Sequence, residues 1–170
     1  MSIGRENQLL KAIPDVLDYK SMLYIGINQV REEMLHLFKE RDYDITILEA
    51  WKSNVDALKS KYPNIIWADV RDLDKIKFLP RFDIVMWWHG PEHIKERELP
   101  KILIELRMKA LLYIIIACPW GIYEQGNCSN PYEEHLAYLY PEFFKELGWQ
   151  TDTIGKEDVK GSNLLAWKRI

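Results

Sequence analysis

Residues 82–94 read FDIVMWWHGPEHI, and this stretch is the most informative part of the chain. Its first half is an apolar run typical of a buried strand, and the run stops at polar side chains and the pair Gly90 and Pro91. In an open sheet of parallel strands, ligands bind outside the carboxyl ends of the strands. The stretch therefore predicts a buried strand that ends at a ligand site.

Strands and helices alternate on both sides of this stretch. Apolar runs predict strands at residues 22–25, 44–48 and 64–68 before it and at residues 111–117 after it. Apolar residues at helical spacing predict the helices between them, with stripes made of Val30, Met34, Leu37 and Phe38, of Trp51, Val55, Leu58 and Tyr62, and of Leu99, Ile102, Leu103 and Leu106. This alternation predicts an α/β protein whose parallel sheet is covered by helices on both faces.

The two ends of the chain depart from this alternation. Apolar residues at helical spacing predict a helical extension within residues 1–20. Near the other end, a short helix at residues 141–147 precedes two strand-like segments at residues 149–154 and 163–167, which we expect to form an antiparallel pair. No linker divides the chain, so we expect a single domain over residues 1–170.

Composition limits the function. A chain of 170 residues, 48% of them hydrophobic, can bury a sizeable core. The net charge of -3 and the mixing of both signs give no strong signal for nucleic-acid binding. The first residues lack a signal-peptide core, and the longest apolar run, residues 110–118, is too short to span a membrane. We therefore expect a cytoplasmic protein with no membrane contact, where Cys118 and Cys128 stay reduced.

Three predicted strands end in residues suited to a nucleotide-like ligand. Gly26 ends the first strand and Glu49 ends the second, at a distance where a carboxylate can accept hydrogen bonds from ribose hydroxyls. Asp69 ends the third strand and can accept from an exocyclic amine, while the N–H of Val70 meets a ring nitrogen. Singly, each is equally well a turn glycine, a solvated carboxylate or a helix cap. Their occurrence at consecutive strand ends favours a ligand site.

At these positions the chain resembles the class I S-adenosylmethionine-dependent methyltransferases, and the resemblance extends from Met22 onward. LYIG at residues 23–26 is similar to the family's glycine turn, ILEA at 47–50 to its ribose-binding strand, and WADV at 67–70 to its adenine-binding segment. Residues 117–121, 130–135 and 143–149 resemble the tail of the small-molecule type.

The resemblance implies a Rossmann-like methyltransferase fold with a mostly parallel seven-stranded sheet and an antiparallel C-terminal strand. It also implies S-adenosylmethionine as cofactor and a small-molecule methyl acceptor, and the chain's size allows a homodimer that completes the acceptor pocket. The residues expected to bind the cofactor are Gly26 and Asn28 at its methionine end, Glu49 and Ala50 at the ribose, Asp69 and Val70 at the adenine, and Trp87 in the pocket wall.

The glycine turn departs from the family pattern. Tyr24 stands where the family has an acidic residue, and Asn28 and Val30 stand where it has further glycines. Asparagine can adopt positive φ, but β-branched valine does so poorly. A methyltransferase-like binding or scaffold protein without catalysis is therefore the alternative function. A nicotinamide dehydrogenase is disfavoured, since only the first glycine of the dinucleotide fingerprint is present.

Two histidines are candidate catalytic bases, because methyl transfer to oxygen or nitrogen removes a proton from the acceptor. His89 follows the central strand, and His135 lies just after a long polar loop at residues 120–131. His89 and His93 also match the H-x-x-E-H pattern of some zinc peptidases. That pattern needs both imidazoles on one helical face, which the Gly-Pro break prevents, so the sequence predicts no metal site.

Overall fold

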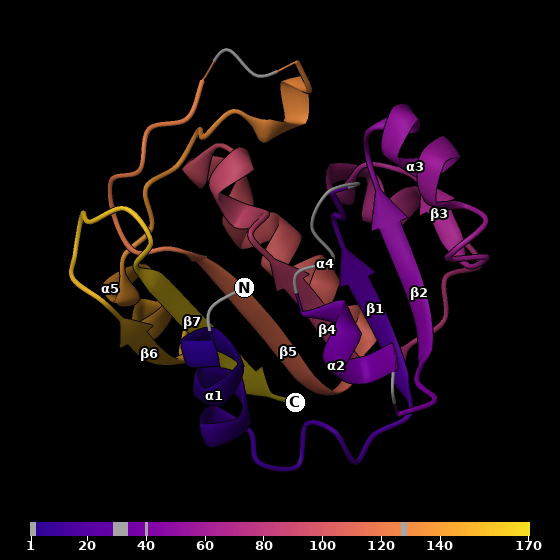
Figure 1. The fold of residues 1–170 in the computed structure, drawn as a ribbon, viewed down its shortest axis with the longest axis horizontal. Helices are drawn as coiled ribbons and strands as arrows, with labels where there is room; N and C mark the ends of the chain where they lie inside the picture. Colours follow the sequence, from indigo (N-terminus) through magenta and orange to yellow (C-terminus); the bar gives the residue numbers. More distant parts are fainter. Residues whose placement is uncertain (1–2, 29–33, 40, 127–128) are drawn as a thin grey trace.

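The computed structural model of the chain describes residues 3–28, 34–39, 41–126 and 129–170. Within these residues it contains a seven-stranded sheet in the order β3-β2-β1-β4-β5-β7-β6 (Figure 1). Six of these strands run in the same direction, and β7 runs opposite to them. The strands are β1 (Ser21–Ile25), β2 (Asp44–Glu49), β3 (Ile65–Trp67), β4 (Phe82–Trp88), β5 (Ala110–Pro119), β6 (Gln150–Ile154) and β7 (Asn163–Arg169). The predicted fold class and the terminal antiparallel strand are both confirmed.

Helices pack on both faces of the sheet, as the alternating pattern predicts. One face buries residues of α1 (Ile3–Ala12), α2 (Leu35–Lys39) and α3 (Lys52–Leu58). The other buries residues of α4 (Leu99–Lys109) and α5 (Pro141–Glu146). The predicted helix stripe that starts at Val30 falls partly outside the described residues, and its described part begins a helix at Leu35.

The strands are apolar on both sides because each side faces a helical layer. In β1, Leu23 lies in the core on the α4 side and Tyr24 in the core on the α1 side. The same alternation sends Trp87 and Trp88 to opposite faces, as expected from the period of a strand. Both indoles are 2% exposed. Burying side chains of this size contributes about 2–3 kcal/mol each, so the central strand is firmly held where it meets the site.

Proline and aspartate set the local structure just beyond the strand ends. Pro91 begins a short 3₁₀ helix, η2 (Pro91–His93), and so confirms the break after β4. Asp69 caps a second 3₁₀ helix, η1 (Val70–Lys75), by accepting a hydrogen bond from the N–H of Arg71. A third, η3 (Glu96–Glu98), leads into α4. These turns hold polar side chains at the carboxyl edge of the sheet.

The segment between β5 and α5 is a long loop held at its base. A β-bridge pairs Gly121 with Leu139 across the two ends of the loop. Asp158, from the β6–β7 hairpin, accepts hydrogen bonds from the Ile122 N–H at 2.7 Å and from the Tyr140 hydroxyl at 2.9 Å. The loop contains one short 3₁₀ helix, η4 (Pro131–Glu133), and in Figure 1 it lies beyond the end of β5.

The described helices are short. None of them has both the length and the apolar character that crossing a membrane requires.

Candidate functional site

A cavity of about 920 Å³ opens at the carboxyl ends of the first four strands. The order of strands reverses between the neighbours β1 and β4, and crevices at this point of an open α/β sheet are where ligands bind. The cavity walls include all nine residues that the sequence assigns to catalysis or cofactor binding: Gly26, Asn28, Glu49, Ala50, Asp69, Val70, Trp87, His89 and His135. Residues from five separate segments therefore meet in one place.

The turn after β1 is fastened to the end of β2. Gly26 has φ of +76°, a conformation that glycine adopts without strain, and its N–H donates to the Leu48 carbonyl at 2.8 Å. The next N–H, of Ile27, donates to Glu49 Oε2 at 2.8 Å. The turn thus has the positive φ that Gly26 allows.

Glu49 is a buried carboxylate, with 5% of its surface exposed. Besides the Ile27 bond, its Oε1 accepts from the Trp51 N–H at 2.7 Å and from the Asn54 amide at 3.3 Å. Burial raises the pKa of Glu49, although the hydrogen bonds from Ile27, Trp51 and Asn54 oppose that rise. A carboxylate has about four acceptor positions, so three bonds leave one for a ligand hydroxyl. Asn54, from α3, also donates to the Ile27 carbonyl at 2.7 Å, so α3 is bonded to the turn after β1.

Asp69 is held by Arg71 in a two-pronged ion pair. Arg71 Nε lies 2.9 Å from Oδ1, and its Nη2 lies 2.5 Å from Oδ2. Burial alone raises the pKa of Asp69, but the hydrogen bonds and charge of Arg71 outweigh it and hold the pKa below its usual range. The N–H of Val70 belongs to the first turn of η1, where backbone donors lack a partner within the helix. An aromatic ring with an amine could bind at this edge.

Trp87 and Gly90 form a close steric pair in the wall. A Cβ added at Gly90 would lie 1.9 Å from Trp87 Nε1, so the indole covers the space where any other residue has a side chain. Trp87 is therefore fixed by the turn that follows its own strand, and it lines the cavity with only 2% of its surface exposed.

The loop after β5 reaches across to the glycine turn. The amide of Asn28 donates to Glu133 Oε1 at 3.0 Å, and Gln125 donates to the Glu133 carbonyl at 2.9 Å. The side chain of Asn28 thus makes a polar contact between the turn and the loop. Ala50, which the sequence predicts to bind a ribose, accepts at its carbonyl from Trp67 Nε1 at 3.0 Å.

His89 is held from both sides and has a strained backbone. Its Nε2 lies 2.9 Å from Arg5 Nη1, and since arginine only donates, Nε2 accepts and Nδ1 carries the proton. Nδ1 then donates to Glu92 Oε1 at 3.2 Å. Its φ of +50° is unusual for a residue other than glycine, and such strain is concentrated at functional sites. His89 thus fixes the carboxylate of Glu92, which is 3% exposed.

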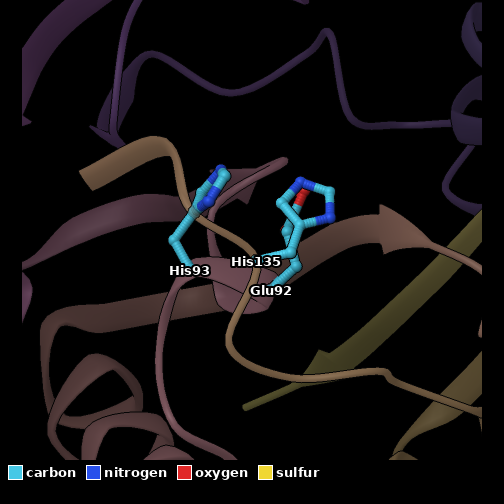
Figure 2. Close-up of side chains that lie close together, drawn as sticks. All are labelled: Glu92, His93 and His135. Carbon is cyan, nitrogen blue, oxygen red and sulfur yellow. The ribbon is translucent and has the colours of Figure 1, made fainter. Parts of the chain in front are cut away.

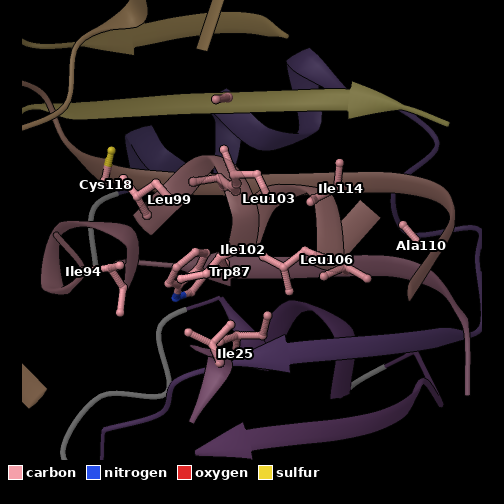
Figure 3. Packing of buried hydrophobic residues seen from close by; sticks show 14 of the residues in the cluster. Ile25, Trp87, Ile94, Leu99, Ile102, Leu103, Leu106, Ala110, Ile114 and Cys118 are labelled. Atoms are coloured by element: carbon pink, nitrogen blue, oxygen red, sulfur yellow. The ribbon is translucent and has the colours of Figure 1, made fainter. Parts of the chain in front are cut away.

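His135 and His93 stand side by side, close to Glu92 (Figure 2). Their ring centroids are 5.0 Å apart, with the rings at 64°. His135 Nδ1 donates to the Tyr123 carbonyl, and burial lowers the pKa of His135, which favours its neutral form. Burial alone raises the pKa of Glu92 nearby, but the hydrogen bond from His89 holds it below its usual range.

Several wall residues have no counterpart in the sequence predictions. Arg5 comes from α1, and Lys160 comes from the β6–β7 hairpin, so neither lies near a predicted strand end. Arg71 and Glu133 lie next to predicted site residues, and the Asp-x-Arg spacing at a helix cap was the available signal for the first. Arg5 and Lys160 come from segments near the two ends of the chain, so only the folded structure shows that they reach the cavity.

No protein-family model matches the sequence, and no curated protein matches it. Solved structures match over nearly all of the chain. One is a methyltransferase dependent on S-adenosylmethionine (SAM) from Archaeoglobus fulgidus, with a TM-score of 0.65, 19% identity, and 96% of this chain and 93% of that chain covered. Another is magnesium protoporphyrin IX methyltransferase from Synechocystis PCC 6803 with bound SAH, with a TM-score of 0.66, 8% identity, and 98% and 80% covered.

A third is the N-methyltransferase NodS from Bradyrhizobium japonicum WM9, with a TM-score of 0.65, 11% identity, and 98% and 94% covered. Identities this low establish the fold and leave the chemistry to the residues of the crevice. The fold of this chain is that of the class I S-adenosylmethionine-dependent methyltransferases.

Proposed function

We propose that the protein transfers the methyl group of S-adenosylmethionine to a small-molecule acceptor. The observation that carries this proposal is Glu49, a nearly buried carboxylate that holds the glycine turn at 2.8 Å and lines a cavity of about 920 Å³. A carboxylate at this strand end is suited to a ribose, and the cavity has the volume of a small-molecule site. The fold shared with SAM-dependent methyltransferases supports the same assignment.

The proposed cofactor site runs along the strand ends in the order β3, β2, β1. The adenine would lie at η1, with its amine on the remaining acceptor position of Asp69 and a ring nitrogen on the N–H of Val70. The ribose would bind at Glu49 and Ala50, and the methionine end at the turn from Gly26 to Asn28. Trp87 would form the wall beside it. The cofactor contributes a sulfonium methyl group, and the protein aligns it with the acceptor.

The acceptor side is the wall made by residues beyond β4 and β5. His89 is occupied by Arg5 and Glu92, so we propose it as a residue that positions its neighbours. His135, with Nδ1 donated to a carbonyl, presents its other nitrogen as the better-placed proton acceptor. A small acceptor fits this wall, since the loop from β5 narrows the crevice by bonding to Asn28.

Calorimetric titration with SAM and with S-adenosylhomocysteine tests the proposal. We expect binding to the wild type, and a loss of about tenfold to a hundredfold in affinity for Glu49→Gln, because a hydrogen bond to a charged group contributes about 1.5–3 kcal/mol. Glu142→Gln is the matched control, since its side chain is 70% exposed on α5 and lies outside the cavity wall. A folded wild type that binds neither compound at millimolar concentration would favour the non-catalytic binding protein.

A further inference from the structure

Three potential metal ligands converge in the acceptor wall, although the sequence predicts no metal. Glu92, His93 and His135 each offer a ligand atom, and these atoms lie within 4.8 Å of one another. Figure 2 shows the two imidazoles side by side and the Glu92 carboxylate behind the His135 ring. His93 and Glu92 come from η2, while His135 comes from the loop after β5. This set differs from the H-x-x-E-H pattern, because His89 is not among the three residues and the second imidazole, of His135, comes from 42 residues beyond His93 in the sequence.

Backbone carbonyls orient both imidazoles for coordination. His93 Nδ1 lies 3.1 Å from the Glu134 carbonyl, and His135 Nδ1 donates to the Tyr123 carbonyl. Because a carbonyl only accepts, each Nδ1 carries the proton, and in the neutral ring Nε2 then presents a lone pair. Metal-binding histidines have this arrangement, in which the second nitrogen donates to a carbonyl and fixes the ring.

The carboxylate of Glu92 is oriented in the same way. Its Oε1 accepts from His89 Nδ1 at 3.2 Å, and His89 Nε2 in turn accepts from Arg5 Nη1 at 2.9 Å. Its Oε2 is buried and has no hydrogen-bond partner among the residues that the structure describes. A buried carboxylate oxygen without a partner is costly. Because Glu92 lies so close to both imidazoles, a cation bound among the three side chains would give this oxygen a partner.

We propose that Glu92, His93 and His135 bind one divalent transition-metal ion such as Zn²⁺. Ligand atoms about 2.1 Å from a common ion lie roughly 3–3.5 Å apart, so the side chains need to approach by about 1–2 Å at most. Two imidazoles and one carboxylate form a set typical of Zn²⁺ and Fe²⁺ sites, and three protein ligands leave further positions open. His89 acts as a positioning residue for Glu92.

The open positions would face the same crevice that we assign to the methyl acceptor. This step rests on the proposed function: an acceptor with an oxygen atom, such as a hydroxyl or carboxylate, would bind the ion through that oxygen. With an ion bound, Nε2 of His135 would be a ligand and would no longer accept the proton, and the ion would instead make the acceptor oxygen easier to deprotonate. The metal site itself does not depend on the cofactor, because none of its three ligands belongs to the proposed cofactor site.

Titration of chelator-treated, full-length protein with Zn²⁺ alone tests the metal site. We expect one ion per chain, and a loss of at least about a hundredfold in affinity for His93→Ala and for His135→Ala, with about tenfold for His89→Gln. Both rings are partly exposed, so these variants are expected to fold, which circular dichroism verifies. His36→Ala is the matched control, since His36 lies on α2 and pairs with Glu6 at 3.2 Å.

The outcomes separate this proposal from the previous one. Wild-type protein that binds no Zn²⁺, or His93→Ala and His135→Ala proteins that bind it as tightly as the wild type, would overturn the metal site. Zn²⁺ binding with no binding of SAM or S-adenosylhomocysteine would overturn the methyltransferase proposal and leave the metal site standing.

Discussion

The contact between Gly90 and Trp87 predicts a large effect for a very small change. In Gly90→Ala, the new Cβ would lie 1.9 Å from Trp87 Nε1 and 2.4 Å from Cδ1, whereas ordinary contact begins at 3.4 Å. The indole must therefore retreat by about 1.5 Å, in a core that is packed as densely as a crystal. Trp87 is 2% exposed and packs in the core, so a shift of the indole disturbs the side chains around it.

We expect Gly90→Ala to destabilise the protein by about 2–3 kcal/mol, the upper part of the range of about 1–3 kcal/mol for overpacking in a tight core. In a chain of this size that corresponds to a fall of roughly 5–10 °C in the melting temperature. Urea unfolding followed by circular dichroism measures the free energy, and a thermal scan measures the midpoint. The variant is also expected to bind SAM less tightly, because Trp87 forms the wall of the proposed cofactor site.

Alanine substitutions at two further glycines distinguish the cost of a steric clash from the cost of backbone strain. A Cβ at Gly126 meets nothing within 4 Å, so Gly126→Ala should change the free energy of unfolding by less than about 0.5 kcal/mol. Gly26 also has open space but a φ of +76°, so Gly26→Ala should cost about 1–2 kcal/mol from strain alone. If Gly90→Ala unfolds with the same free energy as Gly126→Ala, the proposed packing of Trp87 is wrong.

The remaining predictions concern pH and the loop after β5. Burial raises the pKa of Glu49, so its carboxyl group binds a proton more tightly in the folded protein than in the unfolded chain. The free energy of unfolding of the wild type, relative to that of Glu49→Gln, should therefore increase as the pH falls from 7 toward the unfolded pKa of 4.5. Urea titrations of both proteins at several pH values measure this difference, and a difference that grows with rising pH would contradict the burial of the charge. Asp158→Ala removes the acceptor of the Ile122 N–H and the Tyr140 hydroxyl, so hydrogen exchange in residues 121–126 should accelerate by about tenfold while β4 stays protected. Equal exchange in both proteins would show that the bridge between Gly121 and Leu139 is sufficient to hold the loop.

The fold could be predicted because buried parallel strands leave a clear record in the sequence. Each strand from β1 to β5 lies between two helical layers, so it is a short, nearly continuous apolar run such as residues 82–88. The strand ends could be predicted for the same reason, since the first polar residue after each run marks the edge of the sheet. Gly26, Glu49 and Asp69 were found in this way and all line the crevice.

The partners of these residues could not be predicted, because they depend on side-chain geometry and on distant segments. Nothing in the local sequence indicates that Arg5 reaches His89 across 84 positions of sequence. The convergence of His135 with Glu92 depends on the path of the long loop, which residue composition does not determine. Val30 and Cys128 lie outside the described residues, so their predicted roles stay predictions.

The position of Arg5 has a consequence for how the protein matures. Arg5 contacts His89 at 2.9 Å and the Gly161 carbonyl at 3.4 Å, so one corner of the crevice joins the first helix, the central strand and the last hairpin. During synthesis, β1 to β5 can pair before that hairpin has emerged, but this corner cannot close until nearly the whole chain is available. A truncation within the β6–β7 hairpin should therefore leave this corner of the crevice open even where most of the sheet has formed.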